Sequence, residues 1–148
     1  MSDKPLEFLL YGIQSIQFAV FPELGTTQDV ENIRMDLAFD VTPNERCIDV
    51  LPLLRLEKKG GEILVIIEVR VSFKISRDDW PRLLDDDNII RIPKPLAQHL
   101  GVIAVGTGRG VLYEKVQAFP RLKELIWPLI DLTSIVKSDV IIDFSEEE

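Results

Sequence analysis

The sequence predicts an α+β fold in which a four-stranded antiparallel sheet is followed by a long helix packed on one face. Residues Ile63 to Ser76 alternate apolar and polar side chains, the pattern of a strand with one buried face. The stretch from Ile92 to Leu132 contains a long apolar helical run that includes four glycines. Strands that all precede a helix, rather than alternate with helices, indicate an antiparallel sheet with the helix on one side.

Composition bounds the class of protein. The chain has 148 residues, 46% hydrophobic and 28% charged, so we expect a single globular domain over residues 1–148. The net charge is −8 and the basic residues are scattered, which argues against nucleic-acid binding. No apolar run reaches the roughly 20 residues of a membrane span, and the N-terminal run is too short for a signal peptide. A cytoplasmic protein without membrane contact is therefore expected.

The first two strands are predicted from the alternation of apolar and polar residues. Residues Phe8 to Phe21 form the first, and their apolar positions change parity midway. One extra residue near Gln14-Ser15 would restore a single buried face, so we predict a β-bulge there. Residues Ile33 to Val41 alternate without interruption and form the second strand.

A hairpin joins the next two strands. Residues Cys47 to Lys58 form the third strand and Ile63 to Ser76 the fourth, with a tight turn at Lys59-Gly60-Gly61. Pro52 lies inside the third strand. Proline cannot donate a hydrogen bond to a neighbouring strand, so an edge position or a bulge is predicted at this point.

The acidic segment 77–88 is expected to be a surface loop between the sheet and the helix. The aspartates at positions 85, 86 and 87 lack the spaced oxygens, glycine and distal glutamate of a calcium loop. Ile89 to Ile92 is a candidate short strand. Pro93 and Pro95 then suit the first turn of the helix, which should stop at Phe119-Pro120.

The glycines of the helix allow two interpretations, a phosphate cradle or a packing surface. The segment Gly101 to Thr107 has a phosphate-loop spacing without the essential lysine, and Val111 stands where a dinucleotide fingerprint needs glycine. Packing is therefore favoured. Each helical glycine costs about 1 kcal/mol relative to alanine, which close packing must offset. A line of small residues predicts the interface of a homo-oligomer: Ala97, Gly101, Ala104 and Gly108.

Catalytic candidates are few. His99 is the single histidine and is expected to be partly exposed or at an interface. Cys47 is the single cysteine and is expected to be a small buried residue. The spacing of the aspartates in the sequence gives no reason to place Asp40 beside Asp49, or Asp131 beside Asp143. The sequence thus predicts no enzyme, no cofactor and no metal site.

The order of these elements and several short motifs resemble those of SecB-like export chaperones, roughly from Leu9 to Leu132. The first strand contains IQSIQF at Ile13 to Phe18, which resembles the family's opening strand with its isoleucine-x-phenylalanine. The hairpin strand contains IIEV at Ile66 to Val69, which resembles the family's leucine-cysteine-glutamate-valine segment. The remaining motifs are similar to the start of the family's long helix, its stop and the following segment: residues 99–112 (HLGVIAVGTGRGVL), 119–120 (FP) and 126–131 (IWPLID).

This resemblance implies a homotetramer built as a dimer of dimers, which binds unfolded polypeptides in apolar grooves without ATP or metal. Aromatic and aliphatic residues near the junction of sheet and loops would then line the polypeptide-binding grooves: Phe18, Phe21, Phe39, Trp80, Trp127 and Leu129. Two functions remain open. The protein is either a chaperone for unfolded clients, or a scaffold or adaptor that binds one specific folded partner.

The chain also departs from the family. Ser15 and Ala19 stand where acidic residues help to dock the SecA motor, although Glu68 matches, so docking to SecA is not expected. Residues 137–148 form an acidic tail in place of the family's second helix. The tail contains a β-like run at Val140 to Phe144, and either pairing with a sheet edge or disorder would fit its sequence.

Overall fold

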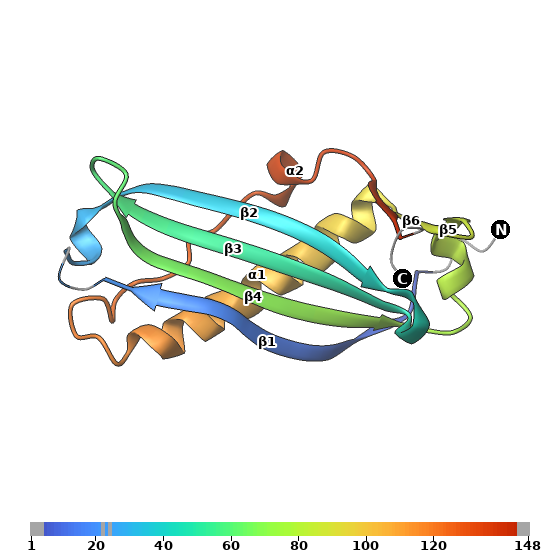
Figure 1. Ribbon diagram of the computed structural model, residues 1–148, viewed down its shortest axis with the longest axis horizontal. Helices are drawn as coiled ribbons and strands as arrows, with labels where there is room; N and C mark the ends of the chain where they lie inside the picture. The colour runs from blue at the N-terminus through green and yellow to red at the C-terminus, as the bar shows by residue number, and fades with distance from the viewer. Residues whose placement is uncertain (1–4, 22, 24, 145–148) are drawn as a thin grey trace.

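The computed structural model describes residues 5–21, 23 and 25–144. Its main sheet has four antiparallel strands in the order β1-β4-β3-β2. The helix α1 (Lys94–Val116) lies diagonally across one face of this sheet (Figure 1). The predicted α+β class, with four antiparallel strands and a long helix on one face, is therefore confirmed. The strands are β1 (Phe8–Val20), β2 (Val30–Thr42), β3 (Cys47–Lys58) and β4 (Ile63–Ile75).

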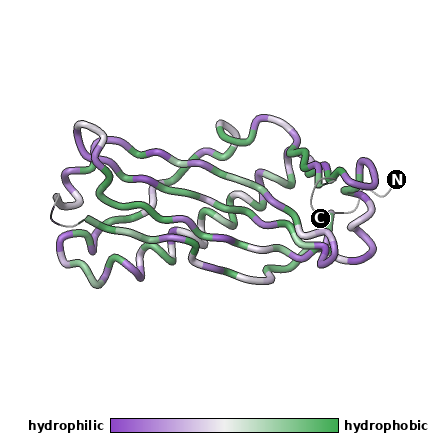
Figure 2. The backbone as a smooth tube through the Cα atoms, in the orientation of Figure 1, coloured by the Kyte–Doolittle hydropathy of each residue, from purple (hydrophilic) through white to green (hydrophobic). Residues whose placement is uncertain are grey.

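The core forms between α1 and the inner faces of β3 and β4. Apolar residues at alternating positions point to the helix, and Figure 2 shows hydrophobic colour along these central strands. Gly60 and Gly61 have φ angles of 93° and 89°, so the predicted glycine turn closes the β3–β4 hairpin. The fully buried residues on the two inner faces include Ile48, Val50, Leu54, Val65, Ile67, Val69, Val71 and Phe73.

Strand β1 contains two irregularities rather than one. Its register against β4 shifts between Leu10 and Gly12 and again between Ser15 and Gln17. The second shift lies beside the predicted Gln14-Ser15 position and confirms that bulge. The first was not expected, because Gly12 has no side chain to reveal the change of parity in the sequence pattern.

The prediction that Pro52 lies at an edge or a bulge is wrong. Strand β3 is central, and Pro52 pairs with Leu37 of β2 in a continuous register. On the β4 side, paired positions resume only at Leu53, after Val50, with the register unchanged. The missing proline N–H is therefore accommodated by a gap in one ladder, without an extra residue.

A smaller sheet lies at one end of the molecule (Figure 1). It has three strands in the order β5-β6-β7, and β6 is the short strand predicted before the helix. The predicted surface loop at 77–88 contains a short helix, η4 (Trp80–Leu83), whose Trp80 and Leu83 are buried. The strands are β5 (Leu84–Asp86), β6 (Ile89–Ile92) and β7 (Val140–Asp143).

Part of the C-terminal tail forms a strand. Strand β7 pairs with β6 from Val140 to Asp143, which confirms pairing with a sheet edge. The remaining tail residues, 145–148, lie outside the described residues. The other short elements are η2 (Thr27–Asp29), η3 (Pro43–Glu45) and α2 (Leu132–Ile135). None of the helices in the described ranges combines the length and hydropathy that a membrane span requires.

The line of small residues in α1 faces the interior of the chain, which corrects its assignment to a subunit interface. Ala97 and Ala104 are fully buried. A Cβ atom at Gly101 would lie 2.9 Å from Leu132 Cδ1, and one at Gly108 would lie 2.7 Å from Trp127 Cζ3. The glycines at these positions are explained by close packing against the protein's own residues.

Candidate functional site

Strand β1 is an edge strand without a single charged residue, FLLYGIQSIQFAV. The opposite edge, β2, contains Glu31, Arg34, Asp36 and Asp40. Edge strands present unpaired backbone N–H and C=O groups, and proteins usually protect them with charges, prolines or covering elements. The β2 edge therefore has charge protection, whereas the β1 edge is suited to pairing with another strand.

The centre of β1 exposes apolar side chains on both faces. Leu10 and Ile13 pair with Phe73 and Val71, so they lie on the helix side of the sheet, where they are 48% and 52% exposed. Leu9 pairs with Lys74 on the opposite face and is 59% exposed. Tyr11 is also exposed, and its ring lies 5.0 Å from the Lys74 ammonium. A partner strand would thus meet apolar surface above and below the backbone.

The two ends of β1 are covered. The Phe8 ring lies edge-on to the rings of Phe73 and His99, each at 5.8 Å. Near the other end, the Phe18 ring lies 6.4 Å from that of Phe119. These contacts fasten the strand to the core at both ends, so the exposed centre is held in an extended shape before any partner binds.

The outward face of α1 is a second uncovered apolar surface. Val102 and Tyr113 are more than half exposed on it. Between them, a Cβ atom at Gly106 or Gly110 would meet nothing within 4 Å. These two glycines are not explained by packing within the chain. They leave a flat strip along the helix that another protein surface could approach closely.

A cavity of about 320 Å³ lies on the β2 side of the molecule. Leu37 and Phe39 of β2 form one wall, and residues 135–142 form the other. Asp139, at its margin, accepts a hydrogen bond of 2.8 Å from the Lys94 backbone N–H and forms an ion pair with Arg91. The cavity is thus apolar on the sheet side, with its nearby acid already paired.

The structure divides the predicted polypeptide-binding residues into three groups. Trp80 and Trp127 belong to the core, so their assignment to a binding surface is corrected. Phe18 and Phe39 are half-buried, and Phe39 lines the β2-side cavity. Phe21 and Leu129 are exposed, Leu129 to 90%. The residues that sequence reasoning missed are Leu9, Leu10, Tyr11 and Ile13, although the uncharged run in an edge strand was a usable signal.

Arg109 holds the loop that contains Leu129. Its Nε donates a 2.8 Å hydrogen bond to the Trp127 carbonyl, and an Nη donates to that of Pro128 at 3.2 Å. The buried Trp127 ring anchors the same loop against Gly108. The exposed Leu129 side chain is therefore presented from a fixed backbone.

The catalytic candidates are placed as follows. Asp40 pairs directly with Asp49 across β2 and β3, although their spacing in the sequence gave no reason to place them together. Asp49 accepts hydrogen bonds from Ser72 at 2.6 Å and from Cys47 at 3.5 Å. Burial, followed by the nearby Asp49 charge, raises the pKa of the Cys47 thiol to about 11. A thiol held protonated in this way is a poor nucleophile at neutral pH.

No described group of three or more His, Cys, Asp or Glu residues is arranged to hold a metal ion. His99 is exposed and contacts the Phe8 ring, and it lies on α1, whereas the Cys47–Asp49–Ser72 cluster lies on β3 and β4. The Cys47–Asp49–Ser72 cluster therefore has no imidazole within it. Its bonds stabilise the outer face of the sheet.

Comparisons with known proteins add a likeness of fold. No protein-family model matches the sequence, and no curated protein matches it. The chain resembles a SecB-like chaperone in structure. That chaperone, from Mycobacterium tuberculosis, was solved in complex with a ChAD peptide from the HigA1 antitoxin. The identity is 13%, the match covers 84% of this chain and 91% of the chaperone, and the TM-score is 0.49.

This solved structure is described as SecB-like, the same family that the sequence motifs resemble. At 13% identity, the likeness describes the arrangement of the strands and the helix. It does not transfer the chaperone's binding residues to individual positions of this chain.

Proposed function

We propose that the protein is a SecB-like chaperone that binds extended polypeptide along the β1 edge without ATP. The observation that supports this is an uncharged edge strand whose centre is apolar and exposed on both faces. An added strand would form backbone hydrogen bonds with β1 and place alternate side chains against Leu10 and Ile13 on one face and Leu9 on the other.

The energetics suit weak, general recognition. Backbone pairing is independent of the client's sequence, so many extended segments can use the edge. Apolar burial contributes about 25 cal/mol per Å², so a client is favoured in proportion to its exposed apolar surface. A net charge of −8 opposes non-specific aggregation through this exposed surface.

Self-association is the second part of the proposal. The subunit interface suggested by the sequence is buried within the chain. The outward strip of α1 is the interface that we propose instead, and it consists of Val102, Gly106, Gly110 and Tyr113. Small residues there allow two helices to approach closely, as at packed helix interfaces. A dimer or tetramer assembled through this strip would leave the β1 edge available to clients.

A matched pair of variants tests the edge. Ile13 on β1 and Ile33 on β2 are both isoleucines, both 52% exposed, and both on edge strands. Ile13→Lys should abolish suppression of aggregation of a denatured model protein, because it places a charge in the pairing edge. Ile33→Lys should retain suppression, since β2 is already charged. Equal activity in the two variants would show that the edge is not the binding site, and no suppression by the wild type would count against a general chaperone.

An adaptor for one folded partner is the alternative function. The feature that favours it is Leu129, a 90% exposed side chain on a loop fixed by Arg109, which suits a complementary pocket. Pull-down from the native host, read by mass spectrometry, separates the two functions. One stoichiometric partner that is lost with Leu129→Ser supports the adaptor, whereas many partners that are lost with Ile13→Lys support the chaperone.

A further inference from the structure

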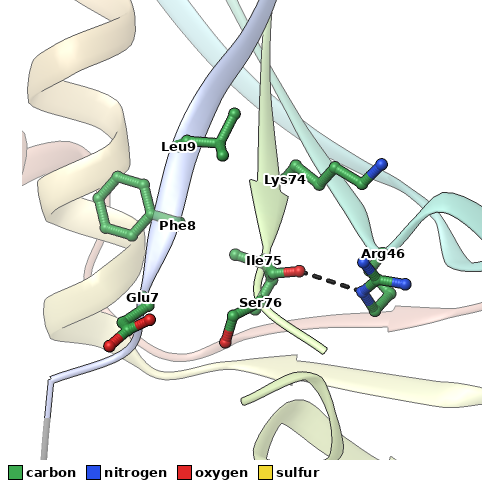
Figure 3. A pocket seen from close by; sticks show the side chains of 7 residues that line it. All are labelled: Glu7, Phe8, Leu9, Arg46, Lys74, Ile75 and Ser76. Carbon is green, nitrogen blue, oxygen red and sulfur yellow. Dashed lines mark hydrogen bonds between the residues drawn. The ribbon is translucent and has the colours of Figure 1, made fainter. Parts of the chain in front are cut away.

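The cavities of the molecule differ in how firmly their walls are held. A pocket of about 360 Å³ at the start of β1 has walls formed by β1, β4 and the turn before β3 (Figure 3). Leu9 and Lys74 pair across β1 and β4, and Arg46 Nε donates a 3.2 Å hydrogen bond to the Ile75 carbonyl. Those walls move only if the main sheet opens. The β2-side cavity differs, because one of its walls is the C-terminal segment 135–142.

Strand β7, in this segment, is a short edge strand. It has four residues, against thirteen in β4, and it pairs along one side with β6. The Phe144 N–H donates to the Asn88 carbonyl at 2.9 Å. Because hydrogen-bonded and non-hydrogen-bonded pairs alternate in an antiparallel ladder, Ile142 and Ile90 form the next hydrogen-bonded pair. A strand with so few bonds opens locally at a lower free energy than the main sheet.

Strand β7 covers apolar surface on two elements without filling the space between them. On β6, Ile90 and Ile92 are fully buried, and β7 places the half-buried Ile142 and Val140 directly opposite them. On the side of β2, a cavity of about 320 Å³ remains between the sheet and the tail. The residues of the β2 wall are Leu37 and Phe39.

Asp139 fastens β7 to the rest of the chain. Its carboxylate accepts a 2.8 Å hydrogen bond from the Lys94 N–H and lies 3.4 Å from an Nη of Arg91. Lys94 begins α1, and Pro93 before it provides no side-chain cap, so the Asp139 carboxylate lies at the positive end of the helix. Asp85 is a second acid on Arg91, at 3.1 Å, but it belongs to β5. Contacts between exposed charges contribute little stability and weaken with salt, so the tail is lightly held.

We propose that segment 138–144 is a displaceable strand, and that the site beneath it binds an extended segment of another polypeptide with the same chemistry. That chemistry is an acidic residue followed by apolar residues, as in SDVIIDF. The carboxylate binds Arg91 and the start of α1, and the apolar side chains pack against β6 and β2. Val136 is buried and its carbonyl accepts a 2.9 Å hydrogen bond from Gln98, so the displaceable part begins after this fixed point.

This site is separate from the β1 edge. Strands β1 and β2 are opposite edges of the main sheet, and the site lies on the β2 side. The chain's own tail competes for it at an effective concentration of about millimolar, as expected for a tethered segment. The apparent affinity for an external segment is reduced by the fraction of molecules in which the site is open. The tail therefore excludes weakly binding segments, and loosening it should strengthen external binding.

A labelled copy of the tail tests the site in the intact chain. Fluorescein-labelled Ser-Asp-Val-Ile-Ile-Asp-Phe is titrated with protein, and binding is followed by anisotropy. Asp139→Ala should bind this peptide about tenfold more tightly than the wild type, because the internal strand is released more often. Asp85→Ala is the matched control, since it removes the other acid on Arg91 and leaves the tail contact in place. Its affinity should stay within about twofold of the wild type.

A disulfide that holds the strand closed provides a reversible test. Ile89 and Asp143 are directly paired, and by the same alternation they form a non-hydrogen-bonded pair, with Cα atoms about 4.5 Å apart in a regular ladder. That separation suits a disulfide. The oxidised Ile89→Cys/Asp143→Cys variant should not bind the peptide, and reduction should restore binding. Cys47 is buried on β3 and is the same in both forms.

Amide hydrogen exchange follows the opening itself. The Ile142 amide should exchange about tenfold faster in Asp139→Ala than in the wild type, with the Val71 amide of β4 unchanged. Faster exchange of both amides would assign the effect to global stability and overturn the displaceable strand. Equal affinities of the wild type and Asp139→Ala for the peptide would overturn it too. Equal binding by the oxidised and reduced double variant, or no binding by any variant, would show that the site beneath β7 does not accept a second segment.

Discussion

Two glycines two residues apart in α1 are predicted to respond in opposite directions to the same substitution. Gly106 lies on the outward strip, where a new Cβ meets nothing within 4 Å. Gly108 faces the core, where a new Cβ would lie 2.7 Å from Trp127 Cζ3 and 3.1 Å from Cη2. We expect Gly106→Ala to stabilise the protein and Gly108→Ala to destabilise it.

The magnitude follows from the pairing of the two variants. Each substitution gains about 1 kcal/mol of helix propensity, and this gain cancels in the comparison. What remains is the overpacking at Gly108, typically about 1 to 3 kcal/mol in a well-packed core. The Trp127 ring is fully buried and its carbonyl is bonded to Arg109, so it has little freedom to withdraw. A difference of about 2 kcal/mol in the free energy of unfolding is expected.

Urea denaturation at one fixed protein concentration measures this difference, because association would otherwise shift the midpoints. Thermal melts should place the two variants about 4 to 8 °C apart. Gly101→Ala provides an intermediate case. Its new Cβ would meet the terminal Cδ atoms of Leu132 and Leu37 at 2.9 and 3.1 Å, and these aliphatic side chains can rotate.

Equal stability of Gly106→Ala and Gly108→Ala would refute the packing of Trp127 against α1. A destabilised Gly106→Ala would have a different meaning. It would show that the outward strip is covered closely, as expected if another subunit packs there without room for a methyl group.

Three further outcomes are expected. Arg109→Met should lower the free energy of unfolding by about 1 to 3 kcal/mol, since two carbonyls lose a charged donor, whereas Arg121→Met should stay within about 0.5 kcal/mol. Cys47 has a folded pKa of about 11 against an ordinary value of 9.0, so its contribution to stability is complete below pH 9 and is lost as pH rises to 11. The urea midpoint should therefore fall more steeply over that range in the wild type than in Cys47→Ala, and parallel curves would contradict this. Val102→Lys should reduce the mass measured by light scattering to that of one 16.9 kDa chain, and an unchanged multiple would exclude the outward strip as the seam.

The elements of the fold were largely predictable because they follow from local patterns. Alternation in β4, the glycine turn and the prolines before α1 each act within a few residues. The position of Pro52 was predicted wrongly because a proline is tolerated in a central strand only where its missing N–H faces a gap in a ladder. The neighbouring strands, which the local sequence does not reveal, determine where that gap lies. The extra residue near Gly12 was hidden for a similar reason, since glycine has no side chain to reveal the parity.

The candidate site was less predictable. In the sequence, Trp80 and Trp127 cannot be distinguished from aromatic residues that line a binding groove. Only their surroundings in the fold show that they belong to the core. The small-residue line of α1 was correctly identified as a packing face, but a sequence cannot say whether the partner surface is in the same chain. Asp40 and Asp49 became neighbours only through the β2–β3 register. The pocket at Arg46 is lined by residues of β1, of β4 and of the turn before β3, and it could not be predicted from any one of these segments.

Because β1 contains two register shifts, the number of residues in the strand determines which side chains point to each face of the sheet. In a regular strand, residues three apart point to opposite faces, yet Leu10 and Ile13 both lie on the helix side. The extra residue between them allows this. Removing Tyr11 would leave nearly the same composition but would return the segment from Phe8 to Ser15 to strict alternation, with the shift between Ser15 and Gln17 still in place. Relatives that differ by one residue in this segment would then display different faces to their partners, so a single deletion can change specificity where many substitutions would not.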